Sequence, residues 1–276
     1  MSAARFRRSW WKASRLPAPD AAADRALLAD AARAAGEIAR RHFRRDPESW
    51  DKGDGQGPVT EADLAVDAML RDRLCKARPD YGWLSEETPD GPARRDCARV
   101  FVVDPIDGTR AFMEGSENFS HSLAVIEDGV PLAAAIHLPM KDDLYLAARG
   151  LGATRNGTAI GVSMRRRLDG AEVLGTRANF ADAHWKGGLP PIVRKFRSSL
   201  AYRLALVAEG SFDAMVTLRP AWEWDIAAGA LIVAEAGGRV ADRHGGPLRF
   251  NNPEPRLDGV VAGTPLVADA LLDRLV

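Results

Sequence analysis

The 276-residue sequence has few cysteines, no long apolar run and no net charge. Its two cysteines, Cys75 and Cys97, lack metal-ligand spacing and follow no secretory signal, so we expect both to be structural and the protein to be cytoplasmic. No apolar run approaches the ~20 residues that span a bilayer, which predicts that no segment crosses a membrane. Basic and acidic residues number 38 each, so composition gives no argument for a nucleic-acid polymer as partner.

The N-terminus is a basic extension. Residues 1–19 include five basic residues and no acidic one, and they lack the apolar core that a signal peptide requires. We expect residues 1–20 to be disordered. The alternative is a weak contact of Trp10 and Trp11 with an anionic surface.

Residues 21–163 predict an N-terminal half built from helices and then strands. Strong helix formers with an apolar stripe predict a long helix over residues 21–45, and a second helix is predicted over 60–78. Short apolar segments separated by glycines follow. Asp128 and Gly129 lie between two of these segments as in a hairpin, which favours antiparallel pairing of consecutive strands.

Residues 164–276 predict a C-terminal α/β half. Strand-like segments alternate there with apolar helical segments, which we expect at about 199–209, 223–236 and 264–274. The sequence contains no internal repeat and no long linker rich in proline or serine. We therefore expect the two halves to pack as one unit.

The stretch RVFVVDPIDGTRAFMEG, residues 99–115, ends a buried strand in carboxylates. A run of β-branched and aromatic residues predicts a strand buried on both faces, and Pro105 predicts that this strand stops at Asp104. Gly108 permits a tight backbone path, and Thr109 is suited to begin a short helical turn. Carboxylates, free amides and a hydroxyl should therefore gather at one strand end.

Four acidic residues lie at the ends of predicted buried elements: Glu86, Asp104, Asp107 and Asp225. Each one alone is explained as a residue that caps a helix or ends a strand. Four clustered carboxylates, however, repel one another and raise one another's pKa unless a cation neutralises them. All the candidate ligands are oxygens, which favours Mg²⁺ over zinc or iron. Two Mg²⁺ ions would neutralise the four charges, and a third would let a phosphate dianion bind.

The segments PVTEAD, WLSEE, DPIDGT and WDIAAGALIVAEAGG resemble the inositol monophosphatase family of Mg²⁺-dependent, Li⁺-sensitive phosphomonoesterases. Their order and spacing match from about residue 22 to the C-terminus. The resemblance implies an α/β fold, a layered αβαβα sandwich of the inositol monophosphatase and fructose-1,6-bisphosphatase type, with the active site between the halves. It also implies two or three Mg²⁺ ions per site, a small phosphorylated metabolite as substrate and the homodimer common among relatives.

The same resemblance implies the metal ligands. Glu86, Asp104 and the carbonyl of Ile106 would hold the first metal ion. Asp104 would bridge to the second ion, together with Asp107 and Asp225. The metal ions would lower the pKa of the attacking water, so that no histidine base is needed.

Catalytic and substrate contacts follow from the resemblance too. Thr109, with Glu86 and Asp63, would orient the attacking water. Lys52 would lie near the phosphate. The phosphate itself would meet three consecutive residues of the DPIDGT segment: Asp107, Gly108 and Thr109.

Two other classes are weighed against this one. Aspartyl-phosphate phosphatases of the haloacid dehalogenase type use D-x-D-G-T after a strand, whereas the gap here is D-x-x-D-G-T, so Asp104 and Asp107 cannot be the nucleophile and acid of that class. A non-catalytic scaffold of the same fold predicts a missing metal ligand. All four acids are present.

The substrate is less well defined by the sequence. Inositol-specific members usually carry an acidic residue seven positions before the metal-binding aspartate, where this chain has Leu218, followed by Arg219. The segment SSLAYR resembles 3'(2'),5'-bisphosphate nucleotidases, and Arg203 is its candidate for a second phosphate. This predicts hydrolysis of adenosine 3',5'-bisphosphate to AMP, with inositol-1-monophosphatase or another sugar or polyol phosphatase as the alternative. Arg203 and Tyr202 are explained equally well as residues of an amphipathic helix.

Overall fold

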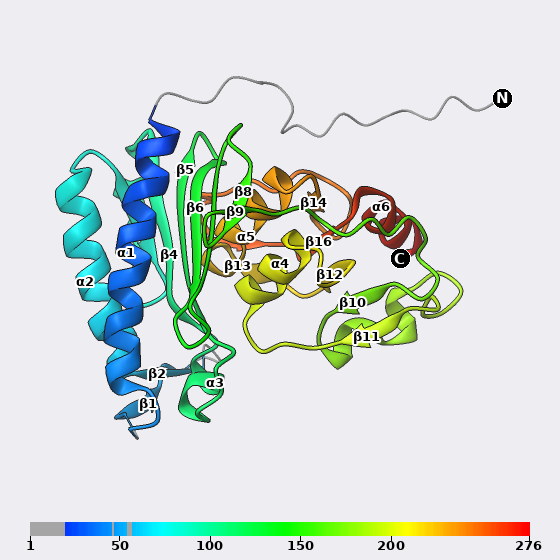
Figure 1. The fold of residues 1–276 in the computed structure, drawn as a ribbon, viewed down its shortest axis with the longest axis horizontal. Helices are drawn as coiled ribbons and strands as arrows, with labels where there is room; N and C mark the ends of the chain where they lie inside the picture. Colours follow the sequence, from blue (N-terminus) through cyan, green and yellow to red (C-terminus); the bar gives the residue numbers. More distant parts are fainter. Residues whose placement is uncertain (1–19, 46, 54–56) are drawn as a thin grey trace.

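The computed structural model describes residues 20–45, 47–53 and 57–276, in which helices and sheets alternate as layers (Figure 1). Two helices cover the outer face of a first sheet, two more lie between that sheet and a second one, and a last helix covers the far face. This is the αβαβα order that the resemblance implies. The predicted extension over residues 1–20 lies outside the described residues except for Asp20.

The described residues form six α-helices: α1 (Ala21–His42), α2 (Glu61–Ala77), α3 (Thr109–Met113), α4 (Leu200–Ala208), α5 (Glu223–Glu235) and α6 (Pro265–Arg274). Three short 3₁₀ turns accompany them: η2 (Pro92–Asp96), η3 (Arg177–Phe180) and η4 (Asp182–His184). The first helix ends at His42 and not at residue 45 as predicted, because Phe43 turns extended. Its ring packs 5.8 Å from that of Phe112 and 5.6 Å from that of Phe119, measured between centroids.

The first sheet has seven strands in the order β3-β4-β5-β6-β7-β8-β9. Their bounds are β3 (Gly82–Ser85), β4 (Arg99–Asp107), β5 (Ser120–Glu127), β6 (Val130–Leu138), β7 (Asp143–Ala148), β8 (Ala153–Arg155) and β9 (Thr158–Ala159). The predicted turn at Asp128 and Gly129 is confirmed, since both residues have positive φ between β5 and β6. The expectation of antiparallel neighbours is wrong for one pair: β3 and β4 are parallel, because the segment between them crosses over through η2.

Strand β4 is buried on both faces, as predicted. Phe101 and Val103 face the core under α1 and α2, whereas Val100 and Val102 face the core around α4 and α5. The strand does not stop at Asp104, however. The ladder shifts register there and resumes where Asp107 pairs with Ser120, so Pro105 falls at the irregularity, where no ladder hydrogen bond from its nitrogen is needed.

The second sheet has the order β11-β10-β12-β16-β14. It is mixed: β10 (Glu172–Leu174) runs parallel to β11 (Val193–Lys195) and β12 (Ala214–Thr217), while β16 (Val260–Gly263) is antiparallel to β12 and β14 (Arg239–Ala241). Two short antiparallel ladders lie outside the sheets, β1 (Ser49–Asp51) with β2 (Pro58–Thr60) and β13 (Ala221–Trp222) with β15 (Arg256–Leu257).

The sheets divide between the two stretches of sequence proposed as halves. All strands of the first sheet fall within residues 82–159, and all strands of the second within 172–263. Helix α5 contacts strands of both sheets, so the largest buried core is continuous between them.

None of the described helices is long and apolar enough to cross a membrane. Cys75 and Cys97 are both free thiols.

A buried carboxylate ties α1 to the end of α2. Asp24 is fully buried and accepts hydrogen bonds from Arg78 Nε at 3.0 Å and from the Tyr81 hydroxyl at 3.0 Å. Arg99 donates to the same Tyr81 oxygen at 2.7 Å. These bonds give the carboxylate the partners that burial demands.

We expect Asp24→Ala to lower the free energy of unfolding by about 1–3 kcal/mol, because it leaves the partners of a buried charged group unpaired. Urea unfolding followed by circular dichroism measures this. Asp30→Ala is the matched control on the same helix, since Asp30 is exposed and 3.6 Å from Arg33; it should change stability by less than about 0.5 kcal/mol. Equal losses for both variants would contradict the prediction.

Candidate metal centre

Three of the four predicted acids meet at one point. One carboxylate oxygen from each of Glu86, Asp104 and Asp225 lies within 4.8 Å of the others. Glu86 directly follows β3 and Asp104 lies on the adjacent parallel strand β4, so both reach the same edge of the first sheet. Asp225 comes from the first turn of α5. Residues far apart in sequence thus form one acidic cluster.

Burial of these carboxylates favours a neutralising cation. Burial raises the pKa of Asp104 well above its usual value, and the charges of Glu86, Asp107 and Asp225 raise it further. The pKa of Asp225 is raised in the same way, by burial and then by Asp107 and Glu86. Asp104 Oδ1 is buried and has no hydrogen-bond partner among the described residues. An oxygen-only site with an unpartnered carboxylate oxygen fits a hard divalent cation.

Asp107 lies beside this cluster but is engaged by α4. Its carboxylate accepts hydrogen bonds from Ser199 Oγ at 2.5 Å and from the backbone amides of Ala201 at 2.6 Å and Leu200 at 3.2 Å. The sequence signals only half of this arrangement: Ser199 is the type of residue that begins a helix, but nothing local shows that Asp107 meets that helix. Its role as a metal ligand stays a prediction.

Asp63, Thr109 and Ile106 lie together, as the resemblance implies. Asp63 accepts a hydrogen bond from the Thr60 backbone amide at 2.8 Å, while the Thr60 hydroxyl accepts from the Asp63 amide, and this capping box begins α2. Thr109 Oγ1 lies 3.2 Å from both Asp63 Oδ1 and the Ile106 carbonyl oxygen. Burial raises the pKa of Asp63 to about 6. A hydroxyl between two acceptors is suited to orient a water molecule.

We expect Thr109→Val to lower kcat by about 100-fold, the usual range for losing a group that assists proton transfer. Thr109→Ser keeps the hydroxyl and should stay within about tenfold of the wild type. Steady-state kinetics on both variants, with folding checked by circular dichroism, gives the comparison. Full activity in Thr109→Val would show that the hydroxyl does not act in the reaction.

Lys52 contacts the cluster from the β1–β2 side. Its Nζ donates to Glu86 Oε1 at 2.8 Å and to Glu87 Oε1 at 2.6 Å. Burial, followed by the charge of Glu86, raises the pKa of Glu87 to about 7. The Lys52 ammonium group therefore offsets part of the negative charge at Glu86 and Glu87, and its contact with a phosphate stays a prediction.

A histidine that sequence reasoning missed supports the backbone that follows Asp104. His121 on β5 is fully buried, and its Nδ1 donates to the Pro105 carbonyl at 2.5 Å. Burial lowers the pKa of His121 to about 3, so the ring is neutral. It lies more than ten residues from Pro105 in sequence, and only the β4–β5 pairing brings the two together.

Glu223 fixes the start of α5, two residues before Asp225. This fully buried carboxylate accepts hydrogen bonds from the amides of Asn251 at 2.6 Å and Asn252 at 2.9 Å. Arg94 of the N-terminal half donates to the Asn252 carbonyl at 2.8 Å. The position of Asp225 is therefore tied to the segment that follows Glu86.

The three residues considered for substrate selection, Leu218, Arg219 and Arg203, differ in their exposure to solvent. Leu218 is buried, and Arg219 is exposed. The charge of Arg219 opposes part of the rise that burial, Asp107 and Glu86 cause in the pKa of Asp225. Arg203 is only 5% exposed, and its guanidinium donates to the backbone carbonyls of Arg197 and Ser198. These contacts favour the interpretation of Arg203 as a helix-packing residue over that of a substrate contact. Gly108 has a φ of 102°, which glycine adopts freely, and it precedes α3 beside Thr109.

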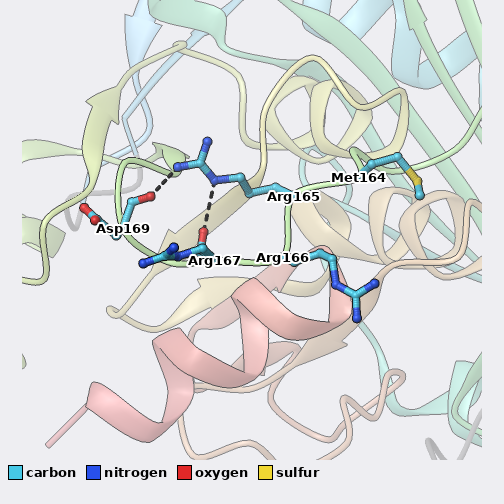
Figure 2. Close-up of a pocket in the computed structure, with 5 residues that line it drawn as sticks. All are labelled: Met164, Arg165, Arg166, Arg167 and Asp169. Carbon is cyan, nitrogen blue, oxygen red and sulfur yellow. Dashed lines mark hydrogen bonds between the residues drawn. The ribbon is translucent and has the colours of Figure 1, made fainter.

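A cavity of about 530 Å³ lies elsewhere, in the turn that joins the halves. Met164, Arg165, Arg166, Arg167 and Asp169 line it (Figure 2). Arg165 folds back onto the carbonyls of Arg167 and Asp169. In the described structure no carboxylate pairs with Arg166 or Arg167, and a short basic turn of this kind is typical of a solvated surface. The acidic cluster is the candidate site.

Comparison with known proteins agrees with this geometry. The model of the inositol monophosphatase family matches residues 22–274. An inositol-1-monophosphatase of Rhizobium meliloti is 36% identical over 231 residues, which cover 77% of this chain and 80% of the relative. Nus factor SuhB of Escherichia coli K12 is 35% identical over 259 residues, covering 89% and 92%.

Solved structures of similar proteins share the fold of this chain. The extragenic suppressor protein suhB from Bartonella henselae superposes with a TM-score of 0.77 at 29% identity, covering 91% of this chain and 97% of that chain. An IMPase from Thermotoga maritima gives a TM-score of 0.76 at 29% identity, covering 91% and 95%. The likeness extends over both sheets.

Proposed function

This chain belongs to the inositol monophosphatase family of phosphomonoesterases, and from that premise we propose that it is a Mg²⁺-dependent hydrolase of a small phosphate monoester. One observation carries the proposal: Glu86, Asp104 and Asp225 converge within 4.8 Å, and Asp104 Oδ1 has no hydrogen-bond partner among the described residues. A non-catalytic scaffold would have no reason to retain a buried oxygen without a partner, which costs stability.

The all-oxygen donor set supports Mg²⁺, and the four negative charges support two or three ions. Glu86, Asp104 and the Ile106 carbonyl would hold one ion, and Asp104, Asp107 and Asp225 another. When bound, Mg²⁺ supplies the positive charge that admits a phosphate dianion and lowers the pKa of water. Without it, the carboxylates would repel the substrate.

The remaining steps fall to the chain's own residues. Thr109 and Asp63 hold and orient the attacking water through the hydroxyl and carboxylate that lie 3.2 Å apart. Lys52 offsets charge at Glu86 and Glu87 and offers an ammonium group to a phosphate oxygen. Gly108 takes the left-handed conformation that glycine adopts freely, at the start of α3.

For the substrate, we propose a polyol monophosphate of the inositol 1-phosphate type as the leading candidate. Curated relatives named inositol-1-monophosphatase support it. The expectation of a bisphosphate nucleotidase depended chiefly on Arg203, whose guanidinium is buried against backbone carbonyls. Adenosine 3',5'-bisphosphate stays the second candidate, because exposed Arg219 lies within electrostatic reach of Asp225 and would suit a second phosphate.

The deciding experiment is phosphate release in Mg²⁺ from three esters: inositol 1-phosphate, adenosine 3',5'-bisphosphate and AMP. Asp225→Asn serves as the blank for contaminating phosphatases. A kcat/KM at least tenfold higher for inositol 1-phosphate than for the bisphosphate supports the leading candidate, and the reverse order supports the second. No release above the blank from any phosphomonoester in a wider panel would overturn the hydrolase proposal.

A further inference from the structure

Arg203 on α4 is a buried cation without an ion pair. The residue is 5% exposed, its Nε donates to the Arg197 carbonyl at 2.6 Å and one terminal nitrogen donates to the Ser198 carbonyl at 3.2 Å. The guanidinium carbon lies 4.9 Å from the centroid of the Phe196 ring. Within the described residues no carboxylate lies at salt-bridge distance from it. Burying such a group is unfavourable unless its position serves something else.

The turn that Arg203 holds leads directly to Asp107. Carbonyls at 197 and 198 face the guanidinium, while the next groups along the chain, Ser199 Oγ and the amides of Leu200 and Ala201, donate to the Asp107 carboxylate. Ser199 also caps α4 by accepting from the Tyr202 amide at 2.9 Å. The segment at 197–201, which leads into α4, therefore has carbonyls bonded to Arg203 and donors aimed at Asp107.

The position of Ser199 is fixed from a second direction. Its hydroxyl oxygen lies 3.0 Å from the Ser120 hydroxyl on β5, and Ser120 is the residue that pairs with Asp107 in the ladder. If the turn relaxed toward solvent, these contacts would be lost together. From the α4 side, Arg203 contacts the same segment through the carbonyls of Arg197 and Ser198, and Ser198 Oγ donates to the Asn118 carbonyl at 2.8 Å.

We propose that Arg203 is a positioning residue: by clamping the carbonyls of Arg197 and Ser198, it holds the turn at 197–201 so that Asp107 is oriented toward the metal centre. The proposal rests on the proposed function for the identity of the centre. It assigns Arg203 no contact with substrate. The rigid fork of arginine suits this role because it reaches two acceptors at once, which a lysine ammonium on a flexible stem does less well.

The test measures metal binding first, without substrate. Mn²⁺ and Mg²⁺ titrations by calorimetry on the metal-free protein compare the wild type with Arg203→Met and Arg203→Lys. We expect Arg203→Met to weaken the binding of at least one metal ion by about tenfold or more, and Arg203→Lys to retain part of the affinity. This readout stands even if the substrate is other than proposed.

Kinetics then separates positioning from substrate contact. Arg203→Met should lower kcat by about 10–100-fold for inositol 1-phosphate and for adenosine 3',5'-bisphosphate alike, with KM little changed. A rise in KM confined to the bisphosphate, with metal affinity intact, would overturn the proposal in favour of a substrate contact. Unchanged metal affinity and unchanged kcat would show that Arg203 only packs the helix.

Arg149→Met is the matched control. Arg149 is also a partly buried arginine that donates to two backbone carbonyls, those of Val130 and Pro131, and it pairs with Glu127 at 3.1 Å as well. It directly follows β7, and its side chain reaches the β5–β6 turn, at the opposite end of β5 from Ser120. We expect this variant to lose stability without losing metal affinity. A loss of metal affinity equal to that of Arg203→Met would mean that any broken clamp disturbs the centre, and the specific role would fail.

Ser199→Ala covers the case in which Arg203→Met does not fold. This variant removes the hydroxyl that donates to Asp107 and should weaken metal binding by about 3–10-fold. In combination with Arg203→Lys the losses should be less than additive, because both act through Asp107. Full metal affinity in Ser199→Ala and Arg203→Lys would refute the proposal.

Discussion

Asp225→Asn is expected to lower kcat by at least about 100-fold while leaving the melting temperature of the metal-free protein unchanged or higher. Asparagine keeps the shape of the side chain but removes one of several repelling charges from the cluster. Activity assays in Mg²⁺ and thermal unfolding in EDTA measure the two effects. The combination separates a metal ligand from a residue that merely begins α5, whose loss would lower stability and spare activity.

The rise in melting temperature that Asp225→Asn causes in the metal-free protein should increase with pH. Burial, Asp107 and Glu86 hold the pKa of Asp225 well above its usual value in the metal-free fold. A carboxyl whose pKa is higher in the folded than in the unfolded state costs stability as pH rises above its unfolded pKa of about 4. The melting temperature of Asp225→Asn relative to wild type should therefore be greater at pH 8 than at pH 5. Asp72→Asn, a change at an exposed position on α2, should show no such difference.

Excess EDTA is expected to abolish phosphatase activity, and added Mg²⁺ to restore it. The buried carboxylates leave no other means of admitting a phosphate dianion. Because Mg²⁺ should bind the folded state and not the unfolded one, it should also raise the melting temperature. At 100 times its Kd, the gain in the free energy of unfolding should be about 2.7 kcal/mol. Turnover in EDTA equal to that in Mg²⁺ would refute the metal requirement.

The control for this experiment is the Asp225→Asn protein. Mg²⁺ should raise its melting temperature by less than it raises that of wild type, since one ligand is missing. An equal rise in both proteins would place the stabilising ion at another position.

The order of elements was predictable from the sequence because each signal is local. A continuous run of β-branched and aromatic residues marks β4. The Asp128 and Gly129 pair marks the β5–β6 turn, and Thr60 with Asp63 is the capping pair that begins α2. Strand direction was not predictable in the same way. The parallel pairing of β3 and β4 is set by the crossover between them, and its effect, bringing Glu86 beside Asp104, depends on tertiary structure.

The acidic cluster was predictable because several carboxylates at the ends of buried elements would repel one another unless a cation neutralised them. Its supporting contacts were not. His121, Glu223 and Ser199 look like ordinary residues in a strand and at two helix starts, and only the packing shows what each one holds. For Arg203 the sequence allowed both a substrate contact and helix packing, and only the structure shows that its guanidinium donates to two backbone carbonyls.

The position of α5 between the two sheets has a consequence for synthesis on the ribosome. The inner face of the first sheet, with Val102, Ala124 and Ile136, is complete once residue 159 has emerged, but α4 and α5, which cover it, are translated only later. A nascent chain that ends before residue 200 therefore exposes a broad apolar surface. We expect such chains to be held by chaperones and to be released once residue 235 has left the exit tunnel.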